Sequence, residues 1–449
     1  MAGTWNAKNK VRAGAYVNVV GNGTVSTSSN VGVLLLISDQ NFGWGANGVT
    51  TLTAGSNFVK ALGTSIDDAK LLAVKEALKE AETVKLVAVN TGAKATVSDA
   101  SLPWDLTAAF GGTKGNSITV TVEPNASDTS RATVTTVFGS ERVDQQDVTF
   151  DNRASFTGND YITATANSNF TGTAFVTTSK TLAGGTDSAL SNDAIATAMT
   201  DALKNEDYEV ASTGGIVDSS TLHQLLVTVI KDVRDNDGRK VRGVVPDIGA
   251  VNYEGVSVVK NGYVLNDGTK IAPTVAAARF AGLSANADEV TSLTFANIAD
   301  AKAAEPKLDN EETINALNAG KVVFTTRRGG NVVVEKDINS LTTFSAKKPN
   351  QFSKNRVMRV LDTVAQYCED TFENTFIGAV TNNPAGRDLF KANIASYLSN
   401  LQSEGAIQNF DATADIAVSA GSDKDTLIVD VAINPTDSME KLYMTITVS

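Results

Sequence analysis

The feature that most constrains this fold is an alternating run at the end of the sequence, residues 441–448. Leu442, Met444, Ile446 and Val448 occupy every second position, and polar or amphipathic residues lie between them. A period of two is typical of a strand with one buried face. Because the ends of a chain usually fray unless they are docked, we expect this strand to pair with the chain's own sheet or with a neighbouring molecule.

Two amphipathic helix patterns and two strand-like runs come before that terminal strand. The first helix pattern follows Ser353 and ends near Phe372. Asn383 and Pro384 provide a helix start, and Gly405 provides the usual residue just beyond a helix end. Together with the strand-like runs, these helices predict a compact α+β domain.

The first ninety residues predict a different architecture. Residues 31–37 form a continuous apolar run, as expected for a strand that is covered on both faces. Ser65 and Asp68 have the spacing of a helix-capping box, and residues 84–89 are again strand-like. Strand, helix and strand in this order predict a parallel βαβ unit.

The composition changes near Thr91 and changes back after Thr181. The stretch between them is dense in Ser, Thr, Gly and Asn, and residues 117–122 alternate as a strand does. We predict a small all-β module inserted into the α/β domain. Helical periodicity then returns, with helices predicted from Asp193 and Ser220 and a short one from Pro273 through Ala278.

These patterns give the predicted fold class: an α/β and α+β multidomain protein. It has an α/β core domain with an inserted small all-β module, and a C-terminal α+β domain with exchanged terminal strands. The predicted boundaries are 1–30 for an N-terminal arm, 31–90 and 182–345 for the α/β middle domain, 91–181 for the outer β-module, 346–434 for the C-terminal domain and 435–449 for the C-terminal arm strand.

Composition excludes several classes of function. The formal net charge of −12 argues against binding to nucleic acid or to an anionic membrane. The single cysteine, Cys368, excludes an internal disulfide framework, and we expect it to be a buried structural thiol. The first twenty residues lack the apolar core of a secretion signal, so we expect synthesis and folding in a reducing cytoplasm.

A search for chemistry finds no catalytic constellation. His223 is the only histidine, and a nucleophilic triad or a zinc site needs more partners than it has. The glycines at 111–115 lack the Walker spacing and precede a strand pattern, which favours a turn over a phosphate loop. The acids after Asp232 lack the closing Glu of a calcium loop, so we expect a solvated helix end. No catalytic, cofactor-binding or metal-binding residue is predicted.

Several stretches together resemble contractile tail sheath proteins, most of all those of phages and phage-tail-like particles of Gram-positive bacteria. They are Ala2-Gly3-Thr4-Trp5, Phe42-Gly43-Trp44-Gly45, Phe110-Gly111-Gly112, Asn355-Arg356-Val357, Asn383-Pro384-Ala385-Gly386-Arg387 and Leu442-Tyr443-Met444-Thr445. The resemblance covers essentially the whole chain.

The resemblance implies a mechanical subunit and no enzyme. Sheath subunits stack as six-fold rings into a helical homopolymer around an inner tube, and contraction drives the tube through the target cell envelope. The implied partners are further copies of the chain, the inner tail tube protein, and baseplate and tail terminator proteins, with no cofactor. The implied location is the tail of a virion or a tail-like particle made in the host bacterial cytoplasm.

The resemblance also implies that both ends act as arms that add strands to neighbouring subunits. The predicted arm residues are Tyr16, Val17, Val19 and Val20 at one end and Leu442, Met444, Ile446 and Val448 at the other. Strand addition uses main-chain hydrogen bonds for affinity and alternate side chains for register. We expect hinges at 21–23 and 434–437, and we predict that Arg387 and Lys391 face the tube.

Charge predicts one further property of these arms. Lys8, Lys10 and Arg12 have no acidic neighbour, whereas acids at 423, 425, 430, 437 and 440 dominate the C-terminal hairpin region. We hypothesise that this contrast steers the docking of arms between subunits.

Two other functions remain open at this level. A surface-layer protein or adhesin would suit the Thr- and Ser-rich β-module, but the sequence has no secretion signal and is α/β elsewhere. An α/β enzyme with the module as a lid would need a nucleophile or phosphate motif.

Overall fold

The computed structural model describes residues 32–217 and 219–448. The chain divides into two compact units, which are described separately below. Among the described residues, the first contains 32–37, 76–84, 203–217 and 219–448, and the second contains Ser38–Lys75 and Lys85–Ala202. The predicted N-terminal arm residues Tyr16, Val17, Val19 and Val20 lie outside the described residues.

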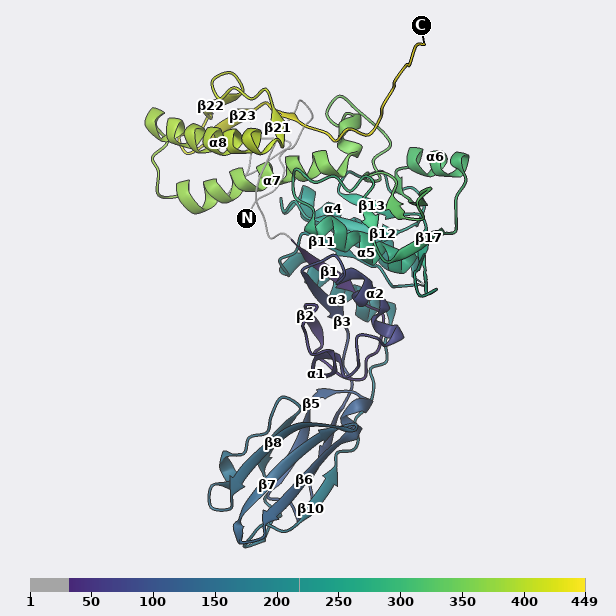
Figure 1. Ribbon diagram of the computed structural model, residues 1–449. Helices are drawn as coiled ribbons and strands as arrows, with labels where there is room; N and C mark the ends of the chain where they lie inside the picture. The colour runs from purple at the N-terminus through teal and green to yellow at the C-terminus, as the bar shows by residue number, and fades with distance from the viewer. Residues whose placement is uncertain (1–31, 218, 449) are drawn as a thin grey trace. The chain divides into compact units, whose positions relative to one another are not determined.

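A parallel sheet lies at the centre of the first unit (Figure 1). Its strands are hydrogen-bonded in the order β18-β13-β12-β11-β1, and each neighbouring pair is parallel. The bounds are β1 Val33–Ile37, β11 Val210–Ser212, β12 Arg242–Pro246, β13 Val256–Val259 and β18 Lys321–Val322. All residues of β11, β12 and β13 are buried, as expected for strands covered on both faces.

Two helices pack on this sheet. Helix α4 (Ser220–Asp235) contacts β12, and α5 (Pro273–Asn286) contacts β1, β11, β12 and β13. Pro273 does begin α5, as predicted, but the helix continues well beyond Ala278. In the structure Gly282 is buried, and a Cβ there would lie 2.7 Å from the Ala77 carbonyl oxygen, so it permits a close approach of two backbones.

Smaller sheets and one surface helix complete this part of the first unit. One sheet has the order β15-β14-β17 (Lys270–Ile271, Gly262–Leu265, Ala301–Glu305), and another has the order β16-β20-β19 (Asn297–Ile298, Val332–Val334, Phe324–Thr326). Strands β19 and β20 form an antiparallel hairpin whose turn contains Arg327 and Arg328. Helix α6 (Asn310–Asn318) begins with a capping box between Asp309 and Glu312, which the sequence reading missed.

The C-terminal part contains the two predicted helices, which lie beside each other (Figure 1). They are α7 (Asn355–Thr371), which continues into a π-helical turn at Phe372–Phe376, and α8 (Pro384–Glu404). Asn383 caps α8 by accepting a hydrogen bond from the Gly386 amide, and Gly405 ends the helix in the left-handed region. Strands β22 (Ile416–Ala420) and β23 (Leu427–Val431) form an antiparallel hairpin, and β21 (Ile407–Gln408) pairs with β24 (Asn434–Pro435).

The second unit begins with short elements: β2 (Gly48–Leu52), α1 (Phe58–Leu62) and a 3₁₀ turn at Ala69–Leu71. Helix α2 (Leu72–Ala77), strand β3 (Thr83–Ala88) and helix α3 (Asn192–Asn205) cross the boundary between the two units. The predicted helix start at Ser65 is wrong. Asp68 is the capping residue, because its carboxylate accepts a hydrogen bond from the Lys70 amide and another from the Thr64 hydroxyl.

Most of the second unit is a β-sandwich, which corresponds to the predicted all-β module. One sheet has the order β10-β6-β7-β8 (Thr178–Thr181, Ile118–Asn125, Asp128–Phe138, Glu141–Thr149), and the other has the order β4-β5-β9 (Lys94–Val97, Trp104–Gly111, Ile162–Ala166). Trp44 and Trp104 lie fully buried in its core. Each indole N–H donates to a main-chain carbonyl, that of Lys60 at 3.0 Å and that of Arg153 at 2.9 Å.

The chain enters and leaves this module at neighbouring points. Thr96 and Ala183 exchange two backbone hydrogen bonds of 2.8 and 3.0 Å. Gly112 approaches Gly43 so closely that a Cβ would lie 2.0 Å from its carbonyl oxygen. The glycines at 111–115 therefore serve chain packing, and Thr113 is held by Asp187 through two hydrogen bonds.

Candidate functional site: the seat of the C-terminal arm

Helix α7 places charged side chains on its buried face. Val357, Val360 and Leu361 supply apolar contacts, as the helical period predicts. Arg356, Arg359 and Asp362 are also almost completely buried. Since buried charges are costly unless they are paired and hydrogen-bonded, their partners show what holds this helix in place.

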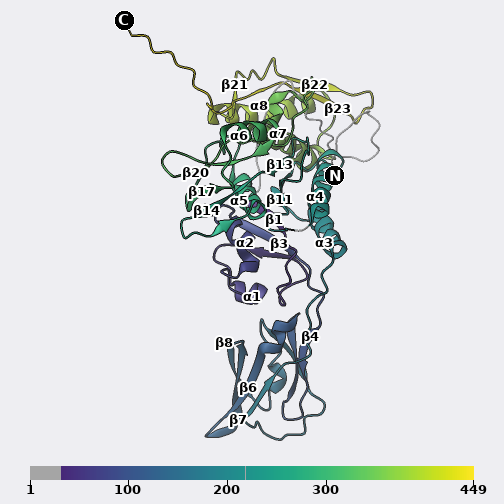
Figure 2. The ribbon, with the colours of Figure 1, turned by 90° about the vertical axis from the view of Figure 1, so that its right-hand side faces the viewer.

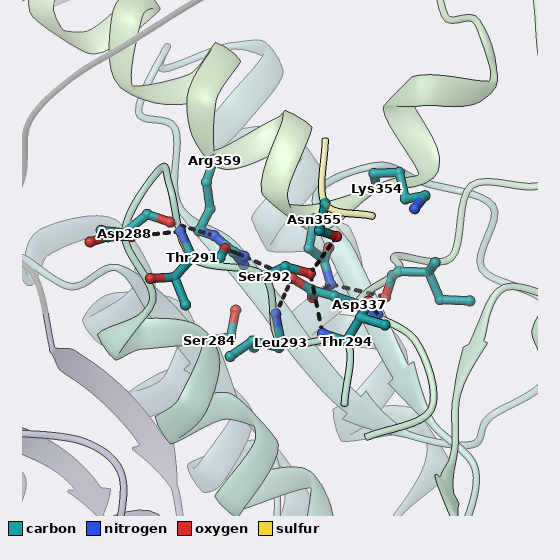
Figure 3. A network of polar contacts seen from close by, with 12 residues as sticks. Ser284, Asp288, Thr291, Ser292, Leu293, Thr294, Asp337, Lys354, Asn355 and Arg359 are labelled. Atoms are coloured by element: carbon teal, nitrogen blue, oxygen red, sulfur yellow. Dashed lines mark hydrogen bonds and ion pairs between the residues drawn. The ribbon is translucent and has the colours of Figure 1, made fainter. Parts of the chain in front are cut away.

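Arg359 makes the most deeply buried ion pair of α7, with Asp337 (Figure 3). The Arg359 Nη2 atom lies 2.7 Å from Asp337 Oδ2, and the two side chains are 3% and 1% exposed. The same guanidinium donates to the carbonyl oxygens of Asp288 and Thr291 at 3.1 and 2.7 Å. Arg359 thus joins α7 both to the segment before it and to the loop that follows α5.

Asp337 receives further hydrogen bonds. The Leu293 amide donates to Oδ2 at 3.1 Å, and the Asn355 side-chain amide donates to Oδ1 at 2.9 Å (Figure 3). Burial alone would raise the pKa of Asp337. The Arg359 guanidinium and these hydrogen bonds outweigh it and hold that pKa below its ordinary value. Asp337 is therefore a buried anion whose carboxylate receives three contacts, one from each of three residues.

A second buried ion pair ties the middle of α7 to α4. Arg234 and Asp362 form a bidentate pair, with N–O distances of 2.9 and 2.7 Å. Arg234 also donates to the Val241 carbonyl at 2.8 Å. Two parallel hydrogen bonds fix direction as well as distance, so α7 has one defined position on the parallel-sheet domain.

The first turn of α7 also holds the segment that follows β24. We call residues 436–440 the arm root and residues 441–448 the arm. Lys354, the capping residue of α7, places its Nζ atom 3.1 Å from Asp437 and 2.5 Å from Glu440. Arg356 donates to the Thr436 hydroxyl at 3.1 Å.

The loop before β16 holds the arm root from another element. The Thr294 hydroxyl donates to the second carboxylate oxygen of Glu440 at 2.9 Å and accepts from the Asp337 amide at 2.9 Å. Ser438 and Ser292 share a hydrogen bond of 3.1 Å. The arm root is thus linked through Thr294 to the Asp337–Arg359 pair.

The arm leaves this seat without forming a strand. In both views it extends from the fold as an irregular trace (Figure 1 and Figure 2). Its apolar side chains are exposed, with fractions of 83% for Leu442, 68% for Met444, 77% for Ile446 and 92% for Val448. Within the described part of the chain, residues 441–448 belong to no sheet. Docking on the chain's own sheet, one of the two predicted alternatives, is therefore wrong.

Comparisons with known proteins can now be set beside this geometry. Models of three phage tail sheath domains match consecutive parts of the chain: the β-sandwich domain at residues 90–187, the central domain at 188–340 and the C-terminal domain at 347–449. The phage-like element PBSX protein XkdK of Bacillus subtilis (strain 168) is 34% identical, with 98% of each chain covered. This chain belongs to the phage tail sheath family.

Solved structures agree with that assignment. The sheath tail protein of Listeria innocua is 33% identical, with a TM-score of 0.80 over 94% of this chain and 95% of that one. The helical sheath of the anti-feeding prophage, in its contracted state, shares the fold with 10% identity, a TM-score of 0.57 and 99% of each chain covered. The predicted sheath family and mixed α/β fold class are thus confirmed, and this sheath protein is a subunit of a contractile tail.

The structure also shows the surroundings of the residues predicted to face a tube. In this sheath protein Arg387 is half-buried and donates to the Asn382 side-chain oxygen at 3.0 Å. Lys391 is half-buried as well, and its ammonium donates to the Ile416 carbonyl at 2.6 Å. Both side chains brace α8 within the C-terminal domain, and their role at a tube remains a prediction.

The two residues with reactive side chains named in the sequence analysis, His223 and Cys368, are packed within the fold. His223 is buried, and its Nδ1 atom lies 2.6 Å from the Thr213 hydroxyl. Cys368 is half-buried against the core between α7 and α8, where burial raises the pKa of its thiol to about 12. A thiol with so high a pKa is a weak nucleophile at neutral pH.

The predicted hinge at 434–437 is not the point where the arm leaves the fold. Asn434 and Pro435 pair with β21, and the Thr436 amide donates to the Ala406 carbonyl at 3.0 Å. The sequence reading missed Lys354, Arg356 and Thr294 because their partners are far away in sequence. One signal was available: Arg356 and Arg359 fall on the same helical stripe as the apolar residues of α7.

Among the described residues, no helix is long and apolar enough to cross a membrane. Two of the acids considered for calcium have partners within the subunit. Asp232 pairs with Lys204 at 2.8 Å and accepts from Asn236 at 2.7 Å, and Asp235 accepts from the Tyr253 hydroxyl at 3.0 Å.

Proposed function

We propose that this sheath protein forms a helical polymer of six-fold rings around an inner tube, and that the arm links neighbouring subunits by strand exchange. Contraction of the polymer drives the tube through the target cell envelope. The partners are further copies of this chain, the inner tube protein, and baseplate and tail terminator proteins. The particle is a phage tail or a tail-like particle made in the host bacterial cytoplasm. The role is mechanical, and the proposal includes no enzymatic step.

One observation carries this proposal: the arm exposes an alternating apolar face although its root is held. A monomer would expose Leu442, Met444, Ile446 and Val448 to water at a cost of roughly 1.5–3 kcal/mol for each large side chain relative to full burial. An exposed strand with unpaired backbone groups is normally a liability. Both features become useful when a second subunit covers them.

The C-terminal domain offers an acceptor of matching chemistry. Strands β22 and β23 pair only with each other among the described residues, so each has one edge without a strand. An arm strand added to that hairpin would form a three-stranded sheet, the smallest size that is stable with one packed face. Residues Val418, Leu427 and Val429 already lie half-buried on this hairpin against the domain core.

The test compares variants for tube formation by negative-stain electron microscopy after co-expression with the inner tube protein of the same particle. A chain that stops after Glu440 keeps the arm root and loses the arm, and we expect no hollow striated sheaths from it. Ile446→Lys places a charge on the apolar face and should also prevent assembly. Thr447→Lys places the same charge on the opposite face and is the matched control. Sheaths of normal abundance from the truncated chain would overturn the strand-exchange proposal.

A further inference from the structure

The arm root is bound to the rest of the subunit, whereas the arm is not. Residues 436–440 belong to no strand, yet they are tied to α7 and to the loop at 292–294. From Lys441 onward, within the described chain, no hydrogen bond or ion pair holds the backbone or side chains. The hydrogen bonds and ion pairs to the subunit therefore end at the peptide bond between Glu440 and Lys441.

Lys354 is the residue that accounts for this change. Its ammonium bridges two carboxylates of the arm root, those of Asp437 and Glu440. The Lys354 and Glu440 side chains are only 16% and 12% exposed, so solvent and salt screen this pair less than an open surface pair. Glu440 has both oxygens engaged, one by Lys354 and the other by the Thr294 hydroxyl.

The position of Lys354 makes it a rigid anchor. It caps α7 with an extended backbone and does not use its side chain for capping. The side-chain amide of the next residue, Asn355, donates to the Asp337 carboxylate (Figure 3). It also donates to the Ser257 hydroxyl at 3.1 Å. The lysine therefore projects from the best-held turn of the helix and presents its charge to the arm root from a fixed backbone.

We propose that Lys354 is a positioning residue that fixes where the C-terminal arm leaves the subunit. It holds the arm root against the 292–294 loop, so that the arm turns about the Glu440–Lys441 peptide and the segment at 434–437 stays with the body. The inference rests on the strand exchange proposed above, for which it specifies the start of the exchanged segment. Without this anchor the exchanged segment would start nearer to Asp437, because Thr436 keeps its contacts with Arg356 and the Ala406 carbonyl, and its direction at the subunit surface would be less defined.

A spin label at position 439 tests this directly. Met439 lies inside the arm root and its side chain is fully exposed, so Met439→Cys carries a label without disturbing the contacts. The background Cys368→Ala removes the single native thiol. We expect restricted label motion in this background and a several-fold shorter rotational correlation time after Lys354→Gln. Lys354→Arg should restore the restriction, and Lys347→Gln, a change at an exposed lysine nearby, should leave it unchanged.

Salt provides a readout that a general loss of stability would not produce. The label should become more mobile as ionic strength rises in the parent protein, and this dependence should be weaker after Lys354→Gln, while the unfolding midpoint changes little. Equal label motion in the Lys354→Gln and parent proteins would overturn the inference. The result is independent of assembly: if the chain that stops after Glu440 still formed sheaths, strand exchange would fail while the label experiment would still decide the role of Lys354.

Discussion

The β-module and the surroundings of helix α7 are stabilised in different ways. In the module, Trp44, Phe138 and Tyr161 pack with ring centroids 4.9–6.1 Å apart, and no ion pair among its described residues is buried. At α7, the pairs Arg359–Asp337 and Arg234–Asp362 are almost fully buried. Apolar packing tolerates small shifts, whereas bidentate and charge-assisted hydrogen bonds demand one geometry. The contrast indicates a self-contained module and a helix that its buried ion pairs hold in one defined position.

The largest expected effect is the loss of one partner of the buried pair. Arg359→Met leaves the Asp337 carboxylate buried without its cation, and we expect a decrease of about 3–5 kcal/mol in the free energy of unfolding. Urea denaturation followed by circular dichroism measures it. The double variant Arg359→Met with Asp337→Asn should recover part of the loss because the remaining group is neutral. The exposed pair Lys270–Glu305 is the control, where Lys270→Ala should change the free energy of unfolding very little, because solvent screens this pair.

An apolar truncation in the module should have a smaller and more local effect. Leu106 is fully buried in the sandwich core, and Leu106→Ala should cost about 3 kcal/mol, mainly through the cavity that it leaves. Hydrogen exchange should show lost protection in β6 and β7 and unchanged protection in α7. Thr107→Ala, at the neighbouring half-buried position, is the matched control. Loss of protection in α7 as well would contradict the self-contained module.

The smallest effect concerns pH. Burial raises the pKa of Glu369, near the end of α7, from its ordinary 4.5 to about 7, although Lys240 acts in the opposite direction. A raised carboxyl pKa contributes stability that is present below about pH 4.5 and is lost as the pH rises through about 7. We expect the loss to be on the order of 2–3 kcal/mol between these values.

Glu369→Gln should remove this part of the pH dependence. Unfolding curves at several pH values between 5 and 8 measure the difference between the variant and the parent protein, which should grow with pH in favour of the variant. Glu404→Gln changes an exposed carboxylate on α8 and is the control. A difference that stays constant across this range would show that Glu369 is ionised in the folded protein at all of these pH values.

Local chemistry made much of the fold predictable. Helix α8 begins and ends where Asn383, Pro384 and Gly405 predict. The alternating residues at 117–122 predict most of strand β6 of the sandwich. Such features depend on neighbours in sequence, so periodicity and capping residues reveal them. The helix start at Ser65 was wrong because two candidate caps lie in one turn, and only the fold selects Asp68.

The site was less predictable than the fold. The arm residues are recognisable from their alternation and from the family resemblance, but the contacts that hold the arm root are not. The ion pairs at this site join residues that are well separated in the sequence. They are Lys354–Glu440, Arg359–Asp337 and Arg234–Asp362. A single sequence contains no signal that pairs one charge with another over such distances. Two of the acids that we had expected to steer the N-terminal arm, Asp437 and Glu440, are engaged by Lys354 within the subunit.

In the proposed strand exchange, the held arm root sets a limit on the link between subunits. If the free length begins at Lys441, the residues 441–448 can span only about 26 Å when fully extended, at roughly 3.3 Å per residue. In that proposal, an acceptor strand that pairs with residues 441–448 must stay within that radius of Glu440 before, during and after contraction. A short tether of fixed origin therefore restricts how far adjacent subunits can separate in any state of the sheath.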